Sequence, residues 1–148
     1  LARDGAYGLR QLTDIALRAL SPSVHAPTTA EEAVLRSADL LRRISGRALG
    51  ACVADADGRP LVVRARPTWD ELVGVAFDQV AAEAEAQADA ATALVLLDAL
   101  GRVAAATGDP ARLAALRSRA ARVRDGARRS LDEPRELARV EAAAAALA

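Results

Sequence analysis

Alanine constrains the fold of this chain more than any other residue. It makes up about a quarter of the 148 positions, and the chain contains only one Phe, one Trp and one Tyr. Alanine has the highest helix propensity of the amino acids, and its small side chain lets neighbouring helices approach closely. Since 52% of the residues are hydrophobic, Leu and Val can supply the core. We therefore expect closely packed helices in one domain over residues 1–148.

The spacing of apolar residues predicts an all-α fold, a bundle of five to six helices with one small β-hairpin inserted after the second helix. The first helix is expected over Leu9–Leu20, with Ile15 beside its apolar stripe. The second is expected to begin at Thr28 or Thr29, because either residue has an acidic residue three positions later, as in a capping box. Gly46 is a suitable residue to end it.

The segment Leu49–Ala65 has a different pattern. Two short apolar runs, Ala51–Ala54 and Leu61–Arg64, are separated by a segment that contains Asp57-Gly58. An Asp-Gly pair between two such runs is a strong signal for a tight turn. We therefore expect the two runs to form the β-hairpin.

The remaining helices have recognisable start signals. Their expected N-caps, in chain order, are Thr68, Asp89, Asp109 and either Ser130 or Asp132. Thr68 is followed by Glu71 at capping-box spacing, and Pro110 follows Asp109 at a position where helices accept proline. The apolar stripe of the fourth helix is expected to consist of Leu94, Leu97, Gly101 and Ala104.

Charge and residue usage exclude several classes of function. The chain has 20 basic and 20 acidic residues, with a net charge of zero, so it lacks the basic excess of a nucleic-acid-binding protein. All bases are Arg, which excludes lysine chemistry. One cysteine, Cys52, and one histidine, His25, exclude an internal disulfide and give no set of ligands for structural zinc. We expect no metal, no cofactor, no nucleic-acid partner and no enzymatic activity.

Charge is distributed unevenly along the second half of the chain. Residues 67–101 contain seven acids and no bases, whereas residues 102–129 contain eight Arg and two Asp. The simplest interpretation is that the basic fifth helix lies beside the acidic third and fourth helices. The alternative is that Arg117, Arg124 and Arg128 face anionic lipid headgroups.

A second group of charged residues lies near the N-terminus. Arg10, Asp14 and Arg18 follow one another at intervals of four and can form a ladder of ion pairs on one helix face. Alternatively, Arg10 and Arg18 bind a small anion together with Asp14 and His25, because guanidinium groups recognise carboxylate and phosphate. These four residues are the candidate ligand site.

Several motifs resemble a bacterial family of predicted membrane proteins, domain of unknown function twenty-two fifty-four. The longest is GLRQLTDIALRALSP over residues 8–22, followed by PTTA at 27–30, and DADGR and AFDQV are weaker matches. The resemblance extends from about Asp4 to about Arg119. The family pattern has Asn-Asp where this chain has His25-Ala26. If that pair binds a ligand, the site is changed here; if it caps the next helix, Thr28 or Thr29 can take over.

The resemblance implies a block of transmembrane helices upstream of this soluble part, with the domain on the cytoplasmic side. No apolar stretch of this chain reaches the ~20 residues needed to cross a bilayer. We therefore expect a non-enzymatic assembly or regulatory domain of a membrane protein. Its expected partners are a second copy, the upstream transmembrane part or an anionic lipid surface. The alternative is a domain that senses a small anion.

Overall fold

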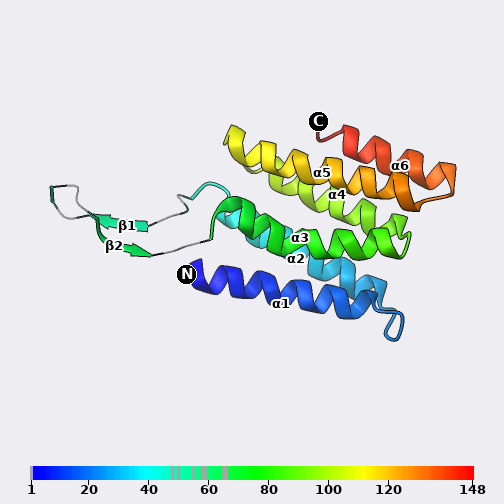
Figure 1. Ribbon diagram of the computed structural model, residues 1–148, viewed down its shortest axis with the longest axis horizontal. Helices are drawn as coiled ribbons and strands as arrows, with labels where there is room; N and C mark the ends of the chain where they lie inside the picture. Colours follow the sequence, from blue (N-terminus) through cyan, green and yellow to red (C-terminus); the bar gives the residue numbers. More distant parts are fainter. Residues whose placement is uncertain (1, 48, 50, 55, 58–59, 65–66) are drawn as a thin grey trace.

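The computed structural model describes residues 2–47, 49, 51–54, 56–57, 60–64 and 67–148. It confirms an all-α bundle (Figure 1). The helices of the described residues are α1 (Ala2–Leu20), α2 (Pro27–Ile44), α3 (Trp69–Ala86), α4 (Ala90–Ala104), α5 (Pro110–Ser130) and α6 (Pro134–Ala145). The first helix is longer than expected and continues through Gly5 and Gly8, because packing against the rest of the bundle overrides their weak helix propensity.

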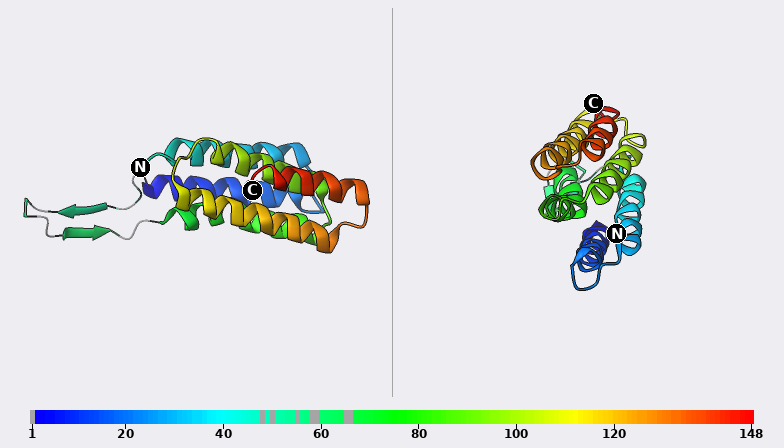
Figure 2. Two further views of the ribbon diagram at one scale, coloured as in Figure 1. Left: turned by 90° about the horizontal axis from the view of Figure 1, so that it is seen from above. Right: turned by 90° about the vertical axis from the view of Figure 1, so that its right-hand side faces the viewer.

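The six helices form three antiparallel pairs stacked side by side. We call α1 with α2 the first helix pair, α3 with α4 the second, and α5 with α6 the third. Seen end-on, α1, α3 and α5 form one layer and α2, α4 and α6 the other (Figure 2). The second pair therefore has neighbours on both sides, while the first and third pairs form the two ends of the stack.

The core lies between the two layers and is centred on α4. This helix contacts α2, α3, α5 and α6, and Leu96, Leu100 and Val103 are fully buried. The predicted stripe was wrong in part: Leu97 is buried, but its expected companions are half-buried. Because α4 has neighbours on several sides, its buried surface is wider than a single stripe.

Three of the predicted helix starts are confirmed. Thr68 and Glu71 form a reciprocal capping box, with the Glu71 amide 3.2 Å from the Thr68 hydroxyl. The Asp89 carboxylate accepts from the Thr92 amide at 3.0 Å. The Asp109 carboxylate accepts from the Ala111 amide at 2.8 Å. Each cap satisfies an amide that has no partner within the helix.

The other two helix starts were predicted wrongly. The N-cap of α2 is Ala26, which forms no side-chain cap, and Thr28 and Thr29 lie inside the helix. The N-cap of α6 is Glu133, whose carboxylate accepts from the Arg135 amide at 3.2 Å. In both cases a proline occupies the first helical position. Its fixed φ and missing N–H set the start of the helix, and the preceding residue becomes the N-cap.

Two side chains join the first helix pair to the second. The buried Thr13 hydroxyl donates to the Leu9 carbonyl at 3.0 Å and lies 2.7 Å from the Val75 carbonyl of α3. Gln87 follows α3 directly, and its side-chain Nε2 donates to the Leu20 carbonyl at the end of α1 at 3.0 Å. That bond gives a partner to one of the carbonyls that a helix leaves free at its C-terminus.

The C-terminal end of α2 is held by α5. The Arg112 guanidinium donates to the Ser45 carbonyl and, at 2.8 Å, to the Arg47 carbonyl. It also lies 5.2 Å from the centre of the Trp69 ring, within cation–π range. Helix α2 ends at Ile44, before the predicted Gly46, and Ser45 follows as its C-cap.

Between α2 and α3 lie two short strands, β1 (Ala51–Ala54) and β2 (Pro60–Arg64). They pair antiparallel, with Ala51 opposite Arg64, and the register shifts between Val53 and Ala54. Asp57 lies in the turn, and Gly58 is outside the described residues. The described part of the strands contacts no helix, and Figure 1 shows the strands extending beyond the end of the bundle.

Candidate functional site

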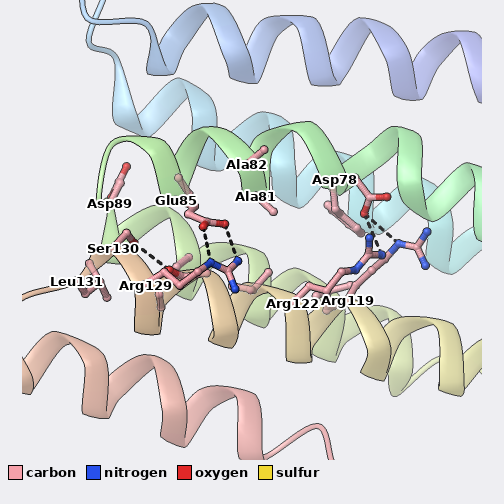
Figure 3. A pocket seen from close by; sticks show the side chains of 17 residues that line it. Asp78, Ala81, Ala82, Glu85, Asp89, Arg119, Arg122, Arg129, Ser130 and Leu131 are labelled. Atoms are coloured by element: carbon pink, nitrogen blue, oxygen red, sulfur yellow. Dashed lines mark hydrogen bonds and ion pairs between the residues drawn. The ribbon is translucent and has the colours of Figure 1, made fainter.

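A cleft lies between α3 and α5 (Figure 3). It encloses about 200 Å³, and its lining includes the small residues Ala81, Ala82 and Gly126. Ion pairs between α3 and α5 stand at both ends of the cleft. Its chemistry is therefore set by arginine and carboxylate groups.

Arg119 of α5 forms the more buried of these contacts. Its side chain is 7% exposed, with Nη1 2.6 Å from Asp70 Oδ1 and Nε 3.1 Å from Asp78 Oδ1. Nη2 also donates to the Asp70 carbonyl at 2.9 Å. Arg122, one turn further on, lies 3.5 Å from the same Asp78 carboxylate. The network fixes the N-terminal half of α3 against α5.

The second contact joins the other end of α3 to α5. Arg129 donates two hydrogen bonds to the Glu85 carboxylate, at 2.8 and 3.0 Å. A Cβ atom at Gly126 would lie 2.8 Å from Glu85 Oε2, which is closer than atoms pack. Glycine at this position therefore leaves room for the Glu85 side chain as it reaches Arg129.

These contacts shift the pKa values of the groups that form them. The hydrogen bond and positive charge of Arg119 hold the pKa of Asp70 below its usual value, and Arg129 lowers the pKa of Glu85 in the same way. Burial disfavours the charged form of Arg119, but the Asp70 and Asp78 carboxylates outweigh it and raise its pKa. The lowered pKa values of Asp70 and Glu85 favour their ionised forms, which suits a structural contact between α3 and α5.

These pairs confirm that the basic fifth helix lies beside the acidic third helix. Arg119, Arg122 and Arg129 all pair with carboxylates of α3. The fourth helix also lies beside α5, as predicted, but within the described residues its Asp98 pairs with Arg102 of its own helix and not with α5.

The three arginines predicted to face lipid also have contacts within the protein. Arg124 lies 2.9 Å from Asp125, Arg128 lies 2.6 Å from Glu141 of α6, and Arg117 donates to the Leu147 carbonyl at 3.0 Å. Arg128 is nevertheless half exposed, at 51%. Contact with a lipid surface stays a prediction.

The four residues of the predicted ligand site do not line one pocket. Arg10 and Asp14 line a cleft between α1 and α3, and Arg10 also faces a neighbouring cleft whose α3 side carries Asp70 and Asp78. Arg18 is exposed near the end of α1. His25 is exposed in the loop, with a φ of 44° and its amide 2.9 Å from the Ser21 carbonyl. Anion binding by this group stays a prediction.

The predicted ladder of ion pairs on α1 is not formed. Within the part of the chain that the structure describes, Arg10, Asp14 and Arg18 make no ion pair. Their spacing allows such pairs, but exposed pairs of this kind contribute little. The charges of α1 are therefore not used to hold the bundle together.

Sequence reasoning missed the exposed apolar side chains of the first helix pair. Tyr7, Ile15 and Val24 are 66%, 45% and 58% exposed. Within the part of the chain that the structure describes, these are the exposed large hydrophobic residues. All three lie on α1 or in the loop that follows it. The available signal was the position of Ile15, which lies beside the apolar stripe of α1 rather than on it.

The first helix pair also carries an open groove, which runs along α2. Leu12 of α1 and Leu35 and Leu40 of α2 are its apolar parts, and charged side chains of α2 stand between them. At Gly8 a Cβ atom would meet Leu40 at 3.7 Å, so α1 and α2 pack closely beside the groove. The first helix pair thus combines exposed apolar residues with a groove.

The geometry defines an all-α domain of stacked helix pairs, joined by arginine–carboxylate contacts at one end and carrying an open groove at the other. A family described as predicted membrane protein (DUF2254) matches residues 1–102, and the chain belongs to this family.

Two mycobacterial proteins are similar to the chain over nearly all of its length. The chain is 34% identical to uncharacterized proteins of Mycobacterium tuberculosis (Rv1290c) and Mycobacterium bovis (Mb1321c), over 98% of its own length. It spans 28% of the length of these relatives. No solved structure matches. Within the described residues, none of the helices has the length and hydropathy needed to cross a membrane.

Proposed function

We propose that this chain is a non-enzymatic assembly or regulatory domain of a bacterial membrane protein, and that its first helix pair makes the assembly contact. The main observation in favour is that Tyr7, Ile15 and Val24 are exposed. Among the large hydrophobic residues that the structure describes, the exposed ones all lie on α1 or in the loop after it. Exposed apolar side chains beside a groove are typical of surfaces that bind another protein segment.

The arrangement of the stack supports the same proposal. Stacked helical units need an outer unit with a polar surface to end the stack. The third helix pair has that character: Arg128 pairs with Glu141, and the exposed residues of α6 are charged, Pro or Ala. The surface of the first pair is not uniformly polar, since Tyr7, Ile15 and Val24 are exposed in addition to its charged residues.

Membership of a membrane protein family supplies the context. The relatives are several times longer than this chain, so the partner is either a second copy or another part of the same protein. We propose that the domain lies on the cytoplasmic side, where an even number of upstream membrane spans would leave it.

Native mass spectrometry of the purified chain and of Ile15→Glu tests this proposal. We expect a defined oligomer without added mass for the original chain, and its loss in Ile15→Glu, because a charge would replace an apolar contact. Arg139→Glu, on the exposed surface of α6, is the control and should keep the oligomer. A monomer in all three samples would exclude a second copy as the partner, and an oligomer that Ile15→Glu leaves intact would contradict the assembly surface.

A second candidate function is the sensing of a small anion. The observation in its favour is that Arg10 and Arg18 are exposed and make no ion pair in the described part of the chain. Titration calorimetry with inorganic phosphate tests it. Arg18→Ala should weaken phosphate binding without lowering thermal stability, and unchanged affinity would show that the assignment of the site is wrong.

A further inference from the structure

The groove of the first helix pair carries a pattern that points to its occupant. Five charged residues of α2 line the groove, and four of them, Glu32, Arg36, Asp39 and Arg43, are spaced by four, three and four positions. The fifth, Glu31, is not part of this pattern. The spacing of the four places them on one face of a helix. All four line the groove and are exposed.

The order of these charges is antisymmetric. Read from Glu32 towards Arg43, the signs are minus, plus, minus, plus. Read from Arg43 towards Glu32, the spacing is the same and every sign is reversed. The centre of the pattern lies between residues 37 and 38, and Leu35 and Leu40 lie at equal distances from it. A segment with this symmetry is complementary to itself when a second copy runs antiparallel.

A two-fold axis requires such self-complementarity, because each residue of one copy meets the symmetric residue of the other. If α2 packs antiparallel on α2 of a second copy about this centre, Glu32 faces Arg43 and Arg36 faces Asp39. Each contact occurs twice. A shift of one helical turn in either direction would bring like charges together, so the pattern also selects the register.

The ion pairs within one copy leave these charged side chains accessible to a second copy. Glu32 pairs with Arg36 at 2.6 Å and Asp39 with Arg42 at 3.0 Å, both along the exposed surface of α2. The side chains are 49–67% exposed. Charges so exposed can be shared with a second copy, turning isolated pairs into a network, whereas isolated surface pairs contribute little.

The apolar residues beside the charges supply area to bury. Leu12, Leu35 and Leu40 line the groove, and Ile15 is 45% exposed three positions after Leu12 on α1. Burial of these side chains gives the attraction, since apolar area removed from water is the main favourable contribution in association. The charges then fix orientation and register.

We propose that two copies of this chain associate through their first helix pairs, with the two α2 helices antiparallel and centred between residues 37 and 38. The inference rests on the proposed function, because it names the partner of the same surface. It commits the groove to a second copy rather than to another segment of the protein.

A charge exchange between two variants tests the pairing. The acidic variant carries Arg36→Glu and Arg43→Glu, and the basic variant carries Glu32→Arg and Asp39→Arg. In either variant alone, the side chains at positions 32, 36, 39 and 43 all have charges of one sign. In a mixture of the two, each acidic side chain again faces a basic one. Sedimentation velocity and native mass spectrometry, at equal concentrations and low salt, report the oligomeric state.

We expect the original chain to be dimeric and each variant alone to dimerise roughly tenfold or more weakly, because like charges face each other. An equimolar mixture should form a heterodimer with about the affinity of the original dimer. The matched control, Arg135→Glu with Arg139→Glu on α6, makes the same change of charge elsewhere and should leave the dimer unchanged. Circular dichroism confirms that each variant is folded.

The outcomes separate this inference from the proposed function. If both charge variants dimerise like the original chain but Ile15→Glu does not, the antiparallel α2 pairing is wrong and the assembly surface stands. The same conclusion follows if the variants are monomeric and mixing restores nothing. If the original chain is a monomer, the pairing of two copies is wrong, and the partner of the first helix pair is then another part of the longer protein. If the original chain is a dimer that neither the charge variants nor Ile15→Glu alter, both the pairing and the assembly surface are wrong.

Discussion

The first and third helix pairs both have the bundle on one side only, yet they differ in how their helices are joined. In the third pair, Arg128 of α5 lies 2.6 Å from Glu141 of α6, and α5 is further tied to α3 through Arg119 and Arg129. In the first pair, the recorded ion pairs of the described residues lie within α2. The exposed large apolar residues belong to the first pair.

This difference shows how one small domain can separate stability from interaction. Contacts between helices that are far apart in sequence stabilise the third pair and its junction with the second. The first pair packs on the bundle through Leu9, Ala16 and Leu41, all buried, and leaves its outer charges and apolar residues free for contact. The four predictions below compare the two regions, beginning with the largest effect.

Truncation of a large apolar side chain to alanine should lower stability more in the third helix pair than in the first. Leu116 of α5 is fully buried, whereas Ile15 of α1 is 45% exposed. We expect Leu116→Ala to lower the free energy of unfolding by about 3 kcal/mol and Ile15→Ala by less than about 1 kcal/mol, because cost follows burial. Urea unfolding followed by circular dichroism measures both. Equal costs would mean that Ile15 is covered in solution.

Removal of an arginine should also lower stability more in the third helix pair than in the first. Arg119→Ala removes a buried side chain and its bonds to Asp70 and Asp78, which we expect to cost on the order of 2 kcal/mol. Arg36→Ala breaks an exposed pair within α2 and should change stability by less than about 0.5 kcal/mol. Urea unfolding of the two variants checks this order, and a larger effect of Arg36→Ala would reverse the comparison.

The N-cap of α2 can be improved, while that of α5 can only be weakened. Ala26 offers no side-chain cap, whereas Asp109 accepts from the Ala111 amide. Ala26→Ser should therefore stabilise by about 0.5–1 kcal/mol, and Asp109→Ala should destabilise by about 1 kcal/mol. Changes in Tm of a few degrees, with opposite signs, are the expected readout. A loss of stability in Ala26→Ser would show that the half-buried methyl group matters more than the cap.

Acid should weaken the junction of α3 with α5. The pKa values of Asp70 and Glu85 are lowered in the folded state, from ordinary values of 3.8 and 4.5. The unfolded chain then binds more protons, so this stabilisation is present above those ordinary values and is lost as pH falls through the lower folded values. Unfolding between pH 7 and pH 3 should show less acid sensitivity in Asp70→Asn with Glu85→Gln. An unchanged profile would contradict the assignment.

Local sequence features predict the helical class, the approximate number of helices and the starts at Thr68, Asp89 and Asp109. These features depend on residues close together in the chain: alanine propensity, apolar spacing and a capping side chain reaching an amide two or three positions on. The starts of α2 and α6 depend on Pro27 and Pro134, which are equally local. At these two positions proline sets the helix start in spite of the nearby threonine, serine and aspartate.

Tertiary structure alone decided which faces are covered. The breadth of the buried surface of α4 follows from its four neighbours, and the exposure of Ile15 follows from having none on that side. The pairing of α5 with α3 was predictable from the charge blocks, but the partner of each arginine was not. A guanidinium reaches whichever carboxylate the packing brings within about 3 Å, and packing is a property of the whole chain.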